Sequence, residues 1–504
     1  MKKYFFYTAI ILIIYFIIAG YNEADWDLWH RLAAGKLFLK TGVAPKVDIF
    51  AYTPTKDLWI DHEWGAGVIF YFLAEKFGSA GLSLLKFCLI FLTFLPVFLI
   101  NRLKSEKSNC YRITFYLLFF YAILFGFLDT IRSQTFTFAL FAIWLYLLEL
   151  VRRGNNKLLF VFPVMTVIWA NLHGGFLAGL GILALYGIGE ALNRRNCAKY
   201  FLTAAISGGL TIINPYGVKY WQFLTEAVTL PRVFITEWQP LLTGGLGFAL
   251  GFKIFLLLAI FALPYVLIKK RREINWAEIL ILIITCCLSF KHVRHNVFFV
   301  IVAAAYMQEY IYSAFKYYFS FLHTKIFFHV NLVKEILIYG VIFCVGFLTV
   351  FFIPLKVNVS EERYPVKSVE FIKRNGLSGN LLVLFNWGGY SLWKLYPHCR
   401  VAIDGRYEEV YHTDLVNESA RFHYLGKDWI DFMKKYKTDL MLIDKTYPVF
   451  SELLYLDNWK LVYQDKISAI FIPVEKHREQ WITLEENLSP QKDFFKSEIA
   501  EKTD

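Results

Sequence analysis

Long runs of apolar residues alternate with short polar segments along roughly the first 355 positions of the chain. Several of these runs reach the length that an α-helix needs to cross the hydrocarbon core of a bilayer, about 20 residues, and the others are somewhat shorter. The pattern predicts about eleven membrane-spanning helices, near residues 4–20, 66–101, 111–128, 134–151, 158–170, 175–192, 199–214, 246–268, 276–290, 296–315 and 333–354. Gly78 and Gly81 could break the second helix.

The pattern changes after Pro354, where short apolar stretches begin to alternate with amphipathic ones. We expect strands near residues 381–385, 400–403, 440–443, 459–463 and 469–472, and helices near 368–375 and 429–436. Such an alternation favours a small α/β domain. The predicted domains are a membrane domain over 1–355, with its first external loop at 21–65, an α/β domain over 356–474, and a charged, loosely ordered tail over 475–504.

Charge and composition fix the class of protein and its orientation. A chain that is 57% hydrophobic and 19% aromatic cannot form one soluble core. Its net charge of +12 comes largely from basic residues at the chain start and in every second loop: Lys2, Lys3, Arg102, Lys104, Lys107, Arg152, Arg153, Lys157, Arg194, Arg195, Lys199, Lys269, Lys270, Arg271 and Arg272. By the positive-inside rule the N-terminus is cytoplasmic and the α/β domain external, in a multi-pass protein of the plasma (inner) membrane. The charge therefore gives no reason to expect a nucleic-acid partner.

The ionisable residues near the other ends of the spans all fall on the external side. A charge beside hydrocarbon is costly, so such residues mark a functional site. In the first external loop, Asp25 and Asp27 follow the first span, and Asp61, His62 and Glu63 precede the second. Helix capping would also explain Asp25.

Between these two acidic groups, residues Leu28–Leu39 are predicted to form a helix along the membrane interface that ends at Gly42. A carboxylate that removes a proton from an acceptor needs a water-facing but partly desolvated position. Asp27, Asp25 and Glu63 are therefore the candidate catalytic residues. Asp61 and His62 are candidates for accessory or acceptor-binding roles.

Two external arginines are the best candidates for binding a phosphate group. A guanidinium pairs bidentately with phosphate, and close to the bilayer its charge needs such a partner. Arg132 lies between the third and fourth spans, and Arg294 shares a turn with His292 and His295 between the ninth and tenth. Pairing with Asp129 or with lipid head groups would equally satisfy Arg132.

Further polar residues on the external side could bind the acceptor or a metal. Histidines with Asp27 or Glu63 could bind a divalent ion such as Zn²⁺ or Mn²⁺, but no pair has the spacing of a dedicated helical site, so the sequence assigns no metal. The histidines are His30, His62, His173, His292 and His295. The candidate acceptor or accessory residues outside the first loop are Asn171, His173, Glu237, Asp404 and Arg406.

Each of these accessory assignments has a structural alternative. Asn171 and His173 could simply cap a helix before Gly174 and Gly175. The stretch from Asn214 to Trp238 could cover a site as a flap or anchor at the interface. Asp404 and Arg406 follow a predicted strand, where ligands of α/β sheets gather, but they could instead form a turn or dock the domain.

The first external loop carries a resemblance to a known group of enzymes. The order Asp25-Trp26-Asp27-Leu28-Trp29-His30, a helix, and Asp61-His62-Glu63-Trp64 before the second span resembles the GT-C superfamily of membrane glycosyltransferases. That superfamily includes protein O-mannosyltransferases and the lipid A aminoarabinose transferase. The resemblance implies a sugar donor on a polyprenyl phosphate or diphosphate, and it matches Asp27 or Asp25 to the catalytic acid of the first loop.

The motif match is confined to about residues 21–78 and departs from the family pattern. An Asp-x-Asp replaces the Asp-Glu pair of the mannosyltransferase-like branch, and His-Glu replaces its Pro-Pro. The chain also contains no Trp-Trp-Asp motif of the oligosaccharyltransferase type, so peptide N-glycosylation is not expected.

The resulting hypothesis is an inverting cell-envelope transferase that moves a sugar from a polyprenyl phosphate to an external glycan, lipid or protein. A surface-glycan polymerase or ligase with a diphosphate-linked oligosaccharide donor is the first alternative. A non-catalytic transporter or lipid-binding protein is the second, and it ranks last because the ionisable residues lie at one surface and no repeat is visible.

Overall fold

The computed structural model describes residues 22–104, 130–230, 232, 235–243, 249–271, 274–318, 356–476 and 494–495. These residues belong to two compact units. The helical unit comprises Met1–Asn22 and Ser83–Lys356, and the mixed unit comprises Glu23–Leu82 and Val357–Asp504. The spans predicted near 4–20, 111–128 and 333–354, and Asp129, lie outside the described residues.

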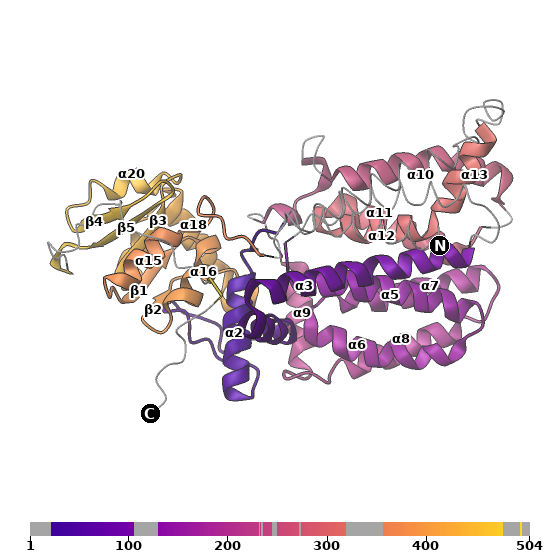
Figure 1. Cartoon of the computed structure of the whole chain (residues 1–504), viewed down its shortest axis with the longest axis horizontal. Coiled ribbons are helices and arrows are strands. Elements are labelled where there is room, and N and C mark those ends of the chain that lie inside the picture. The colour runs from indigo at the N-terminus through magenta and orange to yellow at the C-terminus, as the bar shows by residue number, and fades with distance from the viewer. Residues whose placement is uncertain are drawn as a thin grey trace. The chain divides into compact units, whose positions relative to one another are not determined.

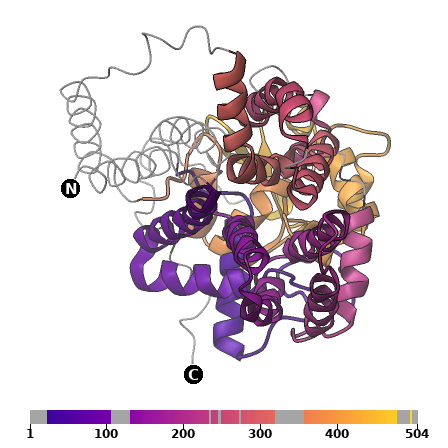
Figure 2. The same ribbon diagram turned by 90° about the vertical axis from the view of Figure 1, so that its right-hand side faces the viewer.

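The helical unit consists of helices, most of them apolar, and short turns join several of them (Figure 1). Their bounds are α5 (Gln134–Arg152), α6 (Val161–Leu172), α7 (Phe176–Leu192), α8 (Ala198–Leu210), α9 (Lys219–Thr229), α10 (Leu250–Lys269), α11 (Trp276–Lys291), α12 (Asn296–Tyr306) and α13 (Gln308–Tyr318). Helix α7 packs on α8 and α11, and α10 packs on α13. Figure 2 looks along most of these helices, which lie beside one another as in a bundle.

The spans predicted within the described residues are helices, and most of their bounds agree within a few residues. One differs in shape, because the run predicted at 296–315 forms two helices, α12 and α13, at an angle of 62°. Three described helices are long and apolar enough to cross a membrane, at Trp64–Lys104, Gln134–Arg152 and Gly251–Lys269, and the bent pair would make a fourth. These helices indicate a membrane location, while the total of about eleven spans stays a prediction.

Apolar side chains also lie on the outside of the helical unit. On α8, Leu202 and Ile206 are 62% and 47% exposed, and on α10, Leu257 and Ile260 are 65% and 57% exposed. Large exposed apolar surfaces are rare on soluble monomers. These faces therefore suit contact with lipid.

Helix α3 (Trp64–Lys104) is broken at Gly78, where φ is 57° and ψ is −146°. Glycine adopts this backbone conformation far more readily than a residue with a side chain. The break confirms the interruption predicted from the sequence. The part of α3 up to Leu82 belongs to the mixed unit, and the part from Ser83 belongs to the helical unit.

The mixed unit is built on a five-stranded sheet in the order β2-β1-β3-β5-β4. Its strands are β1 (Gly379–Val383), β2 (Cys399–Val401), β3 (Leu440–Asp444), β4 (Trp459–Gln464) and β5 (Ser468–Pro473). Strand β1 pairs in parallel with β2 and β3, and β5 pairs antiparallel with β3 and β4. All five predicted strands are present, and the predicted α/β character is confirmed.

Helices cover this sheet, and not all of them were predicted. Helix α15 (Val366–Arg374) packs on β4 and β5, and α16 (Phe385–Leu395) packs on β2. Helices α15 and α19 (Asp431–Lys435) match the sequence prediction, whereas α16 and α18 (Thr413–His423) do not appear in it. In α16, a β-carbon added at Gly388 would lie 2.0 Å from the carbonyl oxygen of Ile403, so the helix needs a glycine there to approach the chain after β2.

The first external loop is part of the mixed unit. The carbonyl oxygen of Phe50 accepts the Val401 amide at 3.0 Å, and the Val401 carbonyl accepts the Tyr52 amide at 3.1 Å. The loop thus extends the sheet at β2. The sequence placed this loop with the membrane spans, whereas its contacts group it with the C-terminal α/β domain.

Helix α2 (Leu28–Thr41) confirms the helix predicted in this loop, and Gly42 ends it with a φ of 72°. The first nine residues of α2 are enclosed by the mixed unit. Residues Leu28 to Lys36 are all buried, and α2 packs on α16. A β-carbon at Gly35 would lie 2.1 Å from the carbonyl oxygen of Gly67, so α2 also contacts α3 closely. Helix α2 is therefore enclosed by protein over most of its length, and its place at the membrane interface stays a prediction.

Candidate functional site

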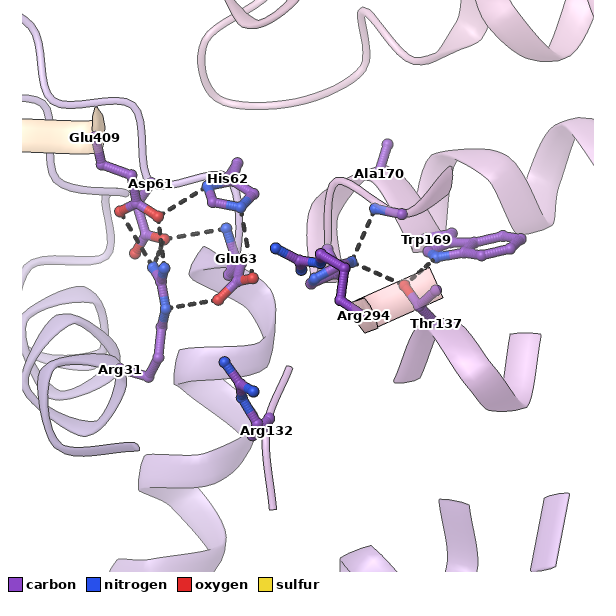
Figure 3. Close-up of polar contacts among 12 residues, drawn as sticks. Arg31, Asp61, His62, Glu63, Arg132, Thr137, Trp169, Ala170, Arg294 and Glu409 are labelled. Carbon is purple, nitrogen blue, oxygen red and sulfur yellow. Dashed lines mark hydrogen bonds and ion pairs between the residues drawn. The ribbon is translucent and has the colours of Figure 1, made fainter. Parts of the chain in front are cut away.

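A buried arginine in the mixed unit forms ion pairs with three carboxylates. Arg31, on α2, places Nη1 2.5 Å from Oδ1 of Asp61, Nε 2.7 Å from Oε2 of Glu63, and Nη2 2.5 Å from Oε1 of Glu409 (Figure 3). Glu409 lies on the short helix α17 (Tyr407–Val410) of the C-terminal domain and also accepts the indole N–H of Trp59 at 3.2 Å. Asp61 and Glu63 were candidates from the sequence, whereas Arg31 and Glu409 were missed.

His62 adds a second cation to this group, which we call the Arg31 cluster: Arg31, Asp61, His62, Glu63 and Glu409. The Nδ1 atom of His62 lies 2.8 Å from Oε1 of Glu409, and its Nε2 atom lies 3.4 Å from Oε1 of Glu63. Burial alone would lower the pKa of His62, but these carboxylates outweigh it and raise the pKa to about 10. His62 is therefore protonated at neutral pH in this arrangement.

Burial and neighbouring charges shift the pKa values of Glu409 and Asp61 in opposite directions. For Glu409, burial opposes ionisation, but Arg31 and His62 lower its pKa below the usual value. For Asp61, burial dominates and raises the pKa despite the contact with Arg31, because Glu409 shares the same guanidinium. Asp61 is completely buried and Glu63 is 7% exposed. This setting differs from the water-facing one expected for catalytic carboxylates and suits residues that fix the loop on the C-terminal domain.

Asp25 and Asp27 occupy the beginning of α2. Asp27 directly precedes the helix, and its amide donates to Oδ1 of Asp25 at 3.0 Å. Both residues are partly exposed, and the positive end of the helix dipole favours a carboxylate at this position. Asp27 is therefore a partly exposed carboxylate at the start of α2, and its role as a base stays a prediction.

The C-terminal domain forms one side of the Asp27 position. A β-carbon added at Gly405 would lie 2.9 Å from Oδ1 of Asp27 and 3.1 Å from Cε1 of His30. His30 is buried, neither of its ring nitrogens forms a hydrogen bond within the described residues, and burial together with Arg31 lowers its pKa. Asp27 thus lies next to a neutral imidazole and a glycine turn.

Asp404 and Arg406 form a closed pair of their own. Arg406 donates from Nε and Nη2 to the two carboxylate oxygens of Asp404 at 2.8 and 2.7 Å, and it forms an ion pair with Asp48 of the first loop. The hydroxyl of Tyr411 donates to Asp404 at 2.6 Å, and the guanidinium lies 4.8 Å from the ring of Trp59. Because Asp404 and Arg406 are buried, this pair fits docking of the first loop on the domain better than acceptor binding.

The helical unit brings the two predicted phosphate ligands to one carboxylate. Arg132, just before α5, places Nη1 2.8 Å from Oε2 of Glu237 and Nη2 3.3 Å from its Oε1. Arg294, in the turn between α11 and α12, places Nη1 3.7 Å from the same Oε1. Burial would raise the pKa of Glu237, but Arg132 and Arg294 outweigh it and lower the pKa to about 2. Glu237 is thus a permanent anion between two arginines.

Trp238, the next residue, completes what we call the arginine cluster: Arg132, Arg232, Glu237, Trp238 and Arg294. The guanidinium carbons of Arg232 and Arg294 lie 4.1 and 4.4 Å from the centre of its ring. Nδ1 of His292 hydrogen-bonds to the carbonyl oxygen of Trp238 at 2.6 Å, which fixes the turn. Arg232 and Trp238 were not among the predicted site residues, and neither carries a distinctive motif.

The remaining predicted residues of the helical unit have structural contacts. Nδ1 of His173 lies 2.9 Å from Oγ1 of Thr137 and accepts the Gly175 amide at 2.8 Å, while Trp169 donates to the same Thr137 oxygen at 2.8 Å (Figure 3). Asn171 donates to the carbonyl oxygens of Val167 and Ile213. These contacts agree with the capping alternative.

His295 and the predicted flap also have structural surroundings. Nδ1 of His295 lies 3.3 Å from the carbonyl oxygen of Leu288, at the end of α11. The predicted flap contains α9, whose Tyr220 is buried and donates its hydroxyl proton to the carbonyl oxygen of Ala170 at 3.0 Å. Helix α9 is thus packed against the helical unit.

Within the described residues, no three histidine, cysteine, aspartate or glutamate side chains are grouped so that they could hold a metal ion. The divalent metal considered from the sequence therefore has no assigned ligands here. It stays a prediction.

Comparison with known proteins places the chain by its fold rather than its sequence. No protein-family profile matches it, and no curated protein sequence does. Among solved structures, it is similar to the Archaeoglobus fulgidus oligosaccharyltransferase in the apo form, with a TM-score of 0.54 and 11% identity over 88% of this chain and 70% of that one. The same enzyme in complex with Zn and sulfate gives a TM-score of 0.52 at 10% identity, over 86% of this chain and 68% of that one.

A second enzyme shares this architecture. The arabinofuranosyltransferase AftD from Mycobacteria matches with a TM-score of 0.53 and 10% identity, over 94% of this chain and 40% of that one. Both enzymes are glycosyltransferases of the GT-C type. The resemblance noted in the first external loop is thereby confirmed at the level of the fold, and the chain is a divergent protein with a GT-C-like fold.

Proposed function

We propose that this protein is a membrane glycosyltransferase that moves a sugar from a polyprenyl-phosphate donor to an external acceptor. The GT-C-like fold supports the class of reaction, because both similar structures are glycosyltransferases by name. The observation that carries the proposal is the convergence of Arg132 and Arg294 on a single anion in the helical unit. The reaction would take place at the external face of the plasma membrane.

Arg132 and Arg294 are the proposed ligands of the donor phosphate. The contact of Arg132 with both oxygens of Glu237 shows that its guanidinium is presented edge-on, as bidentate phosphate binding requires. Their side chains are 19% and 18% exposed, so a lipid phosphate could reach them. His292, which fixes the Trp238 turn, and His295 at the end of α11 would support this site.

The proposed reaction is a single displacement at the anomeric carbon. An acceptor hydroxyl or amine attacks this carbon, the bond from the carbon to the phosphate oxygen breaks, and the electron pair leaves with the lipid phosphate. The acceptor proton goes to the carboxylate of Asp27, which acts as the general base. One displacement inverts the configuration, and the arginines stabilise the charge that develops on the leaving phosphate.

Asp25, Asp61, His62 and Glu63 have supporting roles in this proposal. Asp25 accepts the amide of Asp27 and so fixes the start of α2. The Arg31 cluster anchors the middle of the same helix to the C-terminal domain. Glu63 is therefore proposed as a residue that positions the base, rather than as a second base.

Arg232 favours a second candidate donor. Its guanidinium and that of Arg294 both lie over the ring of Trp238, so the arginine cluster contains three arginines with Arg132. Three arginines suit two phosphate groups better than one. A polymerase or ligase that uses a diphosphate-linked oligosaccharide is therefore the alternative function.

Donor consumption tests the proposal. The purified protein would be reconstituted with the polyprenyl-phosphate lipids of its own membrane, and sugar-free polyprenyl phosphate would be measured by mass spectrometry. Wild type should accumulate it together with a glycosylated acceptor. Failure to do so under conditions in which the protein remains folded would contradict the proposal, whereas accumulation of polyprenyl diphosphate would select the alternative donor.

A further inference from the structure

The carboxylate of Glu237 has the place and the contacts expected of a bound phosphate. Its two oxygens face the two terminal nitrogens of Arg132 at 2.8 and 3.3 Å, and the second oxygen lies 3.7 Å from Arg294. Arginine forms the same forked contact with a carboxylate and with a phosphate. The Glu237 carboxylate and a phosphate would therefore compete for these two guanidiniums.

The Glu237 carboxylate extends from a short turn, Thr236–Trp238. Contacts of Trp238 hold this turn in place. The Trp238 ring contacts Arg232 and Arg294, and its carbonyl oxygen is bonded to His292. The Val293 amide donates to the carbonyl oxygen of Gln239 at 3.1 Å. The turn can thus stay in place while the Glu237 side chain alone moves.

The ion pair between Glu237 and Arg132 is also exposed enough for a phosphate to replace the carboxylate. The Glu237 side chain is 27% exposed, compared with 3% for Glu409 and 0% for Asp61 in the Arg31 cluster. A half-open ion pair costs far less to separate than a buried one. Glu237 is therefore suited to leave Arg132, whereas the carboxylates of the Arg31 cluster are suited to stay.

We propose that Glu237 is an internal occupant of the donor phosphate site, which holds Arg132 and Arg294 in the donor-free protein and is displaced by the donor. This inference rests on the proposed function, because it assumes that these arginines bind the donor phosphate. The carboxylate gives both guanidiniums an anionic partner beside the bilayer while no donor is present. The donor must compete with it, so only a ligand with further contacts to the protein gains the site.

A competing internal group lowers the apparent affinity by the fraction of molecules in which the site is vacant. Removing the charge of Glu237 should therefore tighten phosphate binding. For Glu237→Gln we expect about tenfold tighter binding of a short-chain probe, geranylgeranyl phosphate, to the full-length protein in nanodiscs. Trp238 provides the readout, because its fluorescence should change when the neighbouring anion is exchanged.

Glu226→Gln is the matched control. Glu226 is an exposed carboxylate on α9 in the same part of the chain, and its loss should leave the affinity unchanged. Equal or weaker binding by Glu237→Gln would overturn the inference, because Glu237 would then be a residue that positions the arginines. Thermal stability gives an independent measure: the probe should raise the melting temperature of Glu237→Gln more than that of wild type.

Arg132→Ala and Arg294→Ala separate this inference from the function on which it rests. If the probe binds wild type and loses affinity in both arginine variants, the phosphate role stands, and Glu237→Gln alone decides the inference. If wild type and both arginine variants bind the probe equally, the proposed phosphate site itself is wrong.

Discussion

Arg31 and Glu409 are joined by two hydrogen bonds although they lie 378 positions apart in the chain. Nη2 of Arg31 lies 2.5 Å from Oε1 of Glu409, and Nη1 lies 3.2 Å from Oε2. The pair fastens the helix of the first external loop to the C-terminal domain. Since Asp27 begins the same helix, the C-terminal domain fixes the position of the proposed base.

Replacing Arg31 by methionine should strongly destabilise the mixed unit. Removing one partner of a buried ion pair costs about 3–5 kcal/mol, and here three carboxylates would lose the same partner. Melting temperature and resistance to proteolysis of the purified protein would measure the loss. Arg400→Met, at an exposed position of β2, should change neither. An unchanged melting temperature in Arg31→Met would show that the Arg31 cluster does not hold the loop in place.

The stability of the protein should fall at alkaline pH through His62. The folded-state pKa of about 10 lies above the ordinary value of 6.5, so the stabilisation from the protonated imidazole is complete below pH 6.5. It is lost as the pH rises through about 10. The melting temperature should therefore drop more steeply between pH 7 and 10 in wild type than in His62→Gln. Parallel curves for the two proteins would mean that His62 is not protonated in the fold.

Asp27→Asn should lower the transfer rate by at least about 100-fold, the usual contribution of a general base. Expression and melting temperature should stay near those of wild type, because Asp27 is partly exposed and its side chain does not cap the helix. Sugar transfer to the acceptor would be measured. Asp57→Asn, an exposed carboxylate of the same loop, is the control and should remain fully active. Full activity in Asp27→Asn would remove this residue from the mechanism.

Gly405→Ala should reduce transfer without weakening donor binding. The added methyl group would lie 2.9 Å from the Asp27 carboxylate and 3.1 Å from the His30 ring, so the base would have to shift. The rate constant and the donor affinity would be measured separately. Gly181→Ala, where a β-carbon has no neighbour within 4 Å, should affect neither. A normal rate in Gly405→Ala would mean that the position of Asp27 does not depend on the C-terminal domain.

The elements of the fold were largely predictable, because they follow from local patterns. The period of apolar residues located β1, β3 and β5, and glycines located the end of α2 at Gly42 and the break at Gly78. Helix α16 escaped prediction because Gly388 and Gly389 disfavour a helix in isolation. These two glycines allow α16 to approach Ile403 and Trp26 closely, and only the folded chain reveals this contact.

Several residues of the two clusters were singled out from the sequence, but their pairing was not predicted. The sequence singled out Arg132, Glu237 and Arg294 from three separate segments, and nothing local indicated that they meet. Arg31 escaped notice because it lies within a helix that was read as interfacial. Its role depends on Glu409, which only the tertiary fold brings close.

Native mass spectrometry of the detergent-purified protein tests the central claim most directly. Wild type would be compared with Arg132→Ala, Arg294→Ala and, as a control, Arg195→Ala, whose side chain is 55% exposed. We predict a co-purifying polyprenyl-phosphate lipid in wild type and in Arg195→Ala, with its mass identifying the sugar, and its loss from the other two variants. A bound lipid of this kind that persists in both arginine variants, or ordinary phospholipid alone in every sample, would contradict the account.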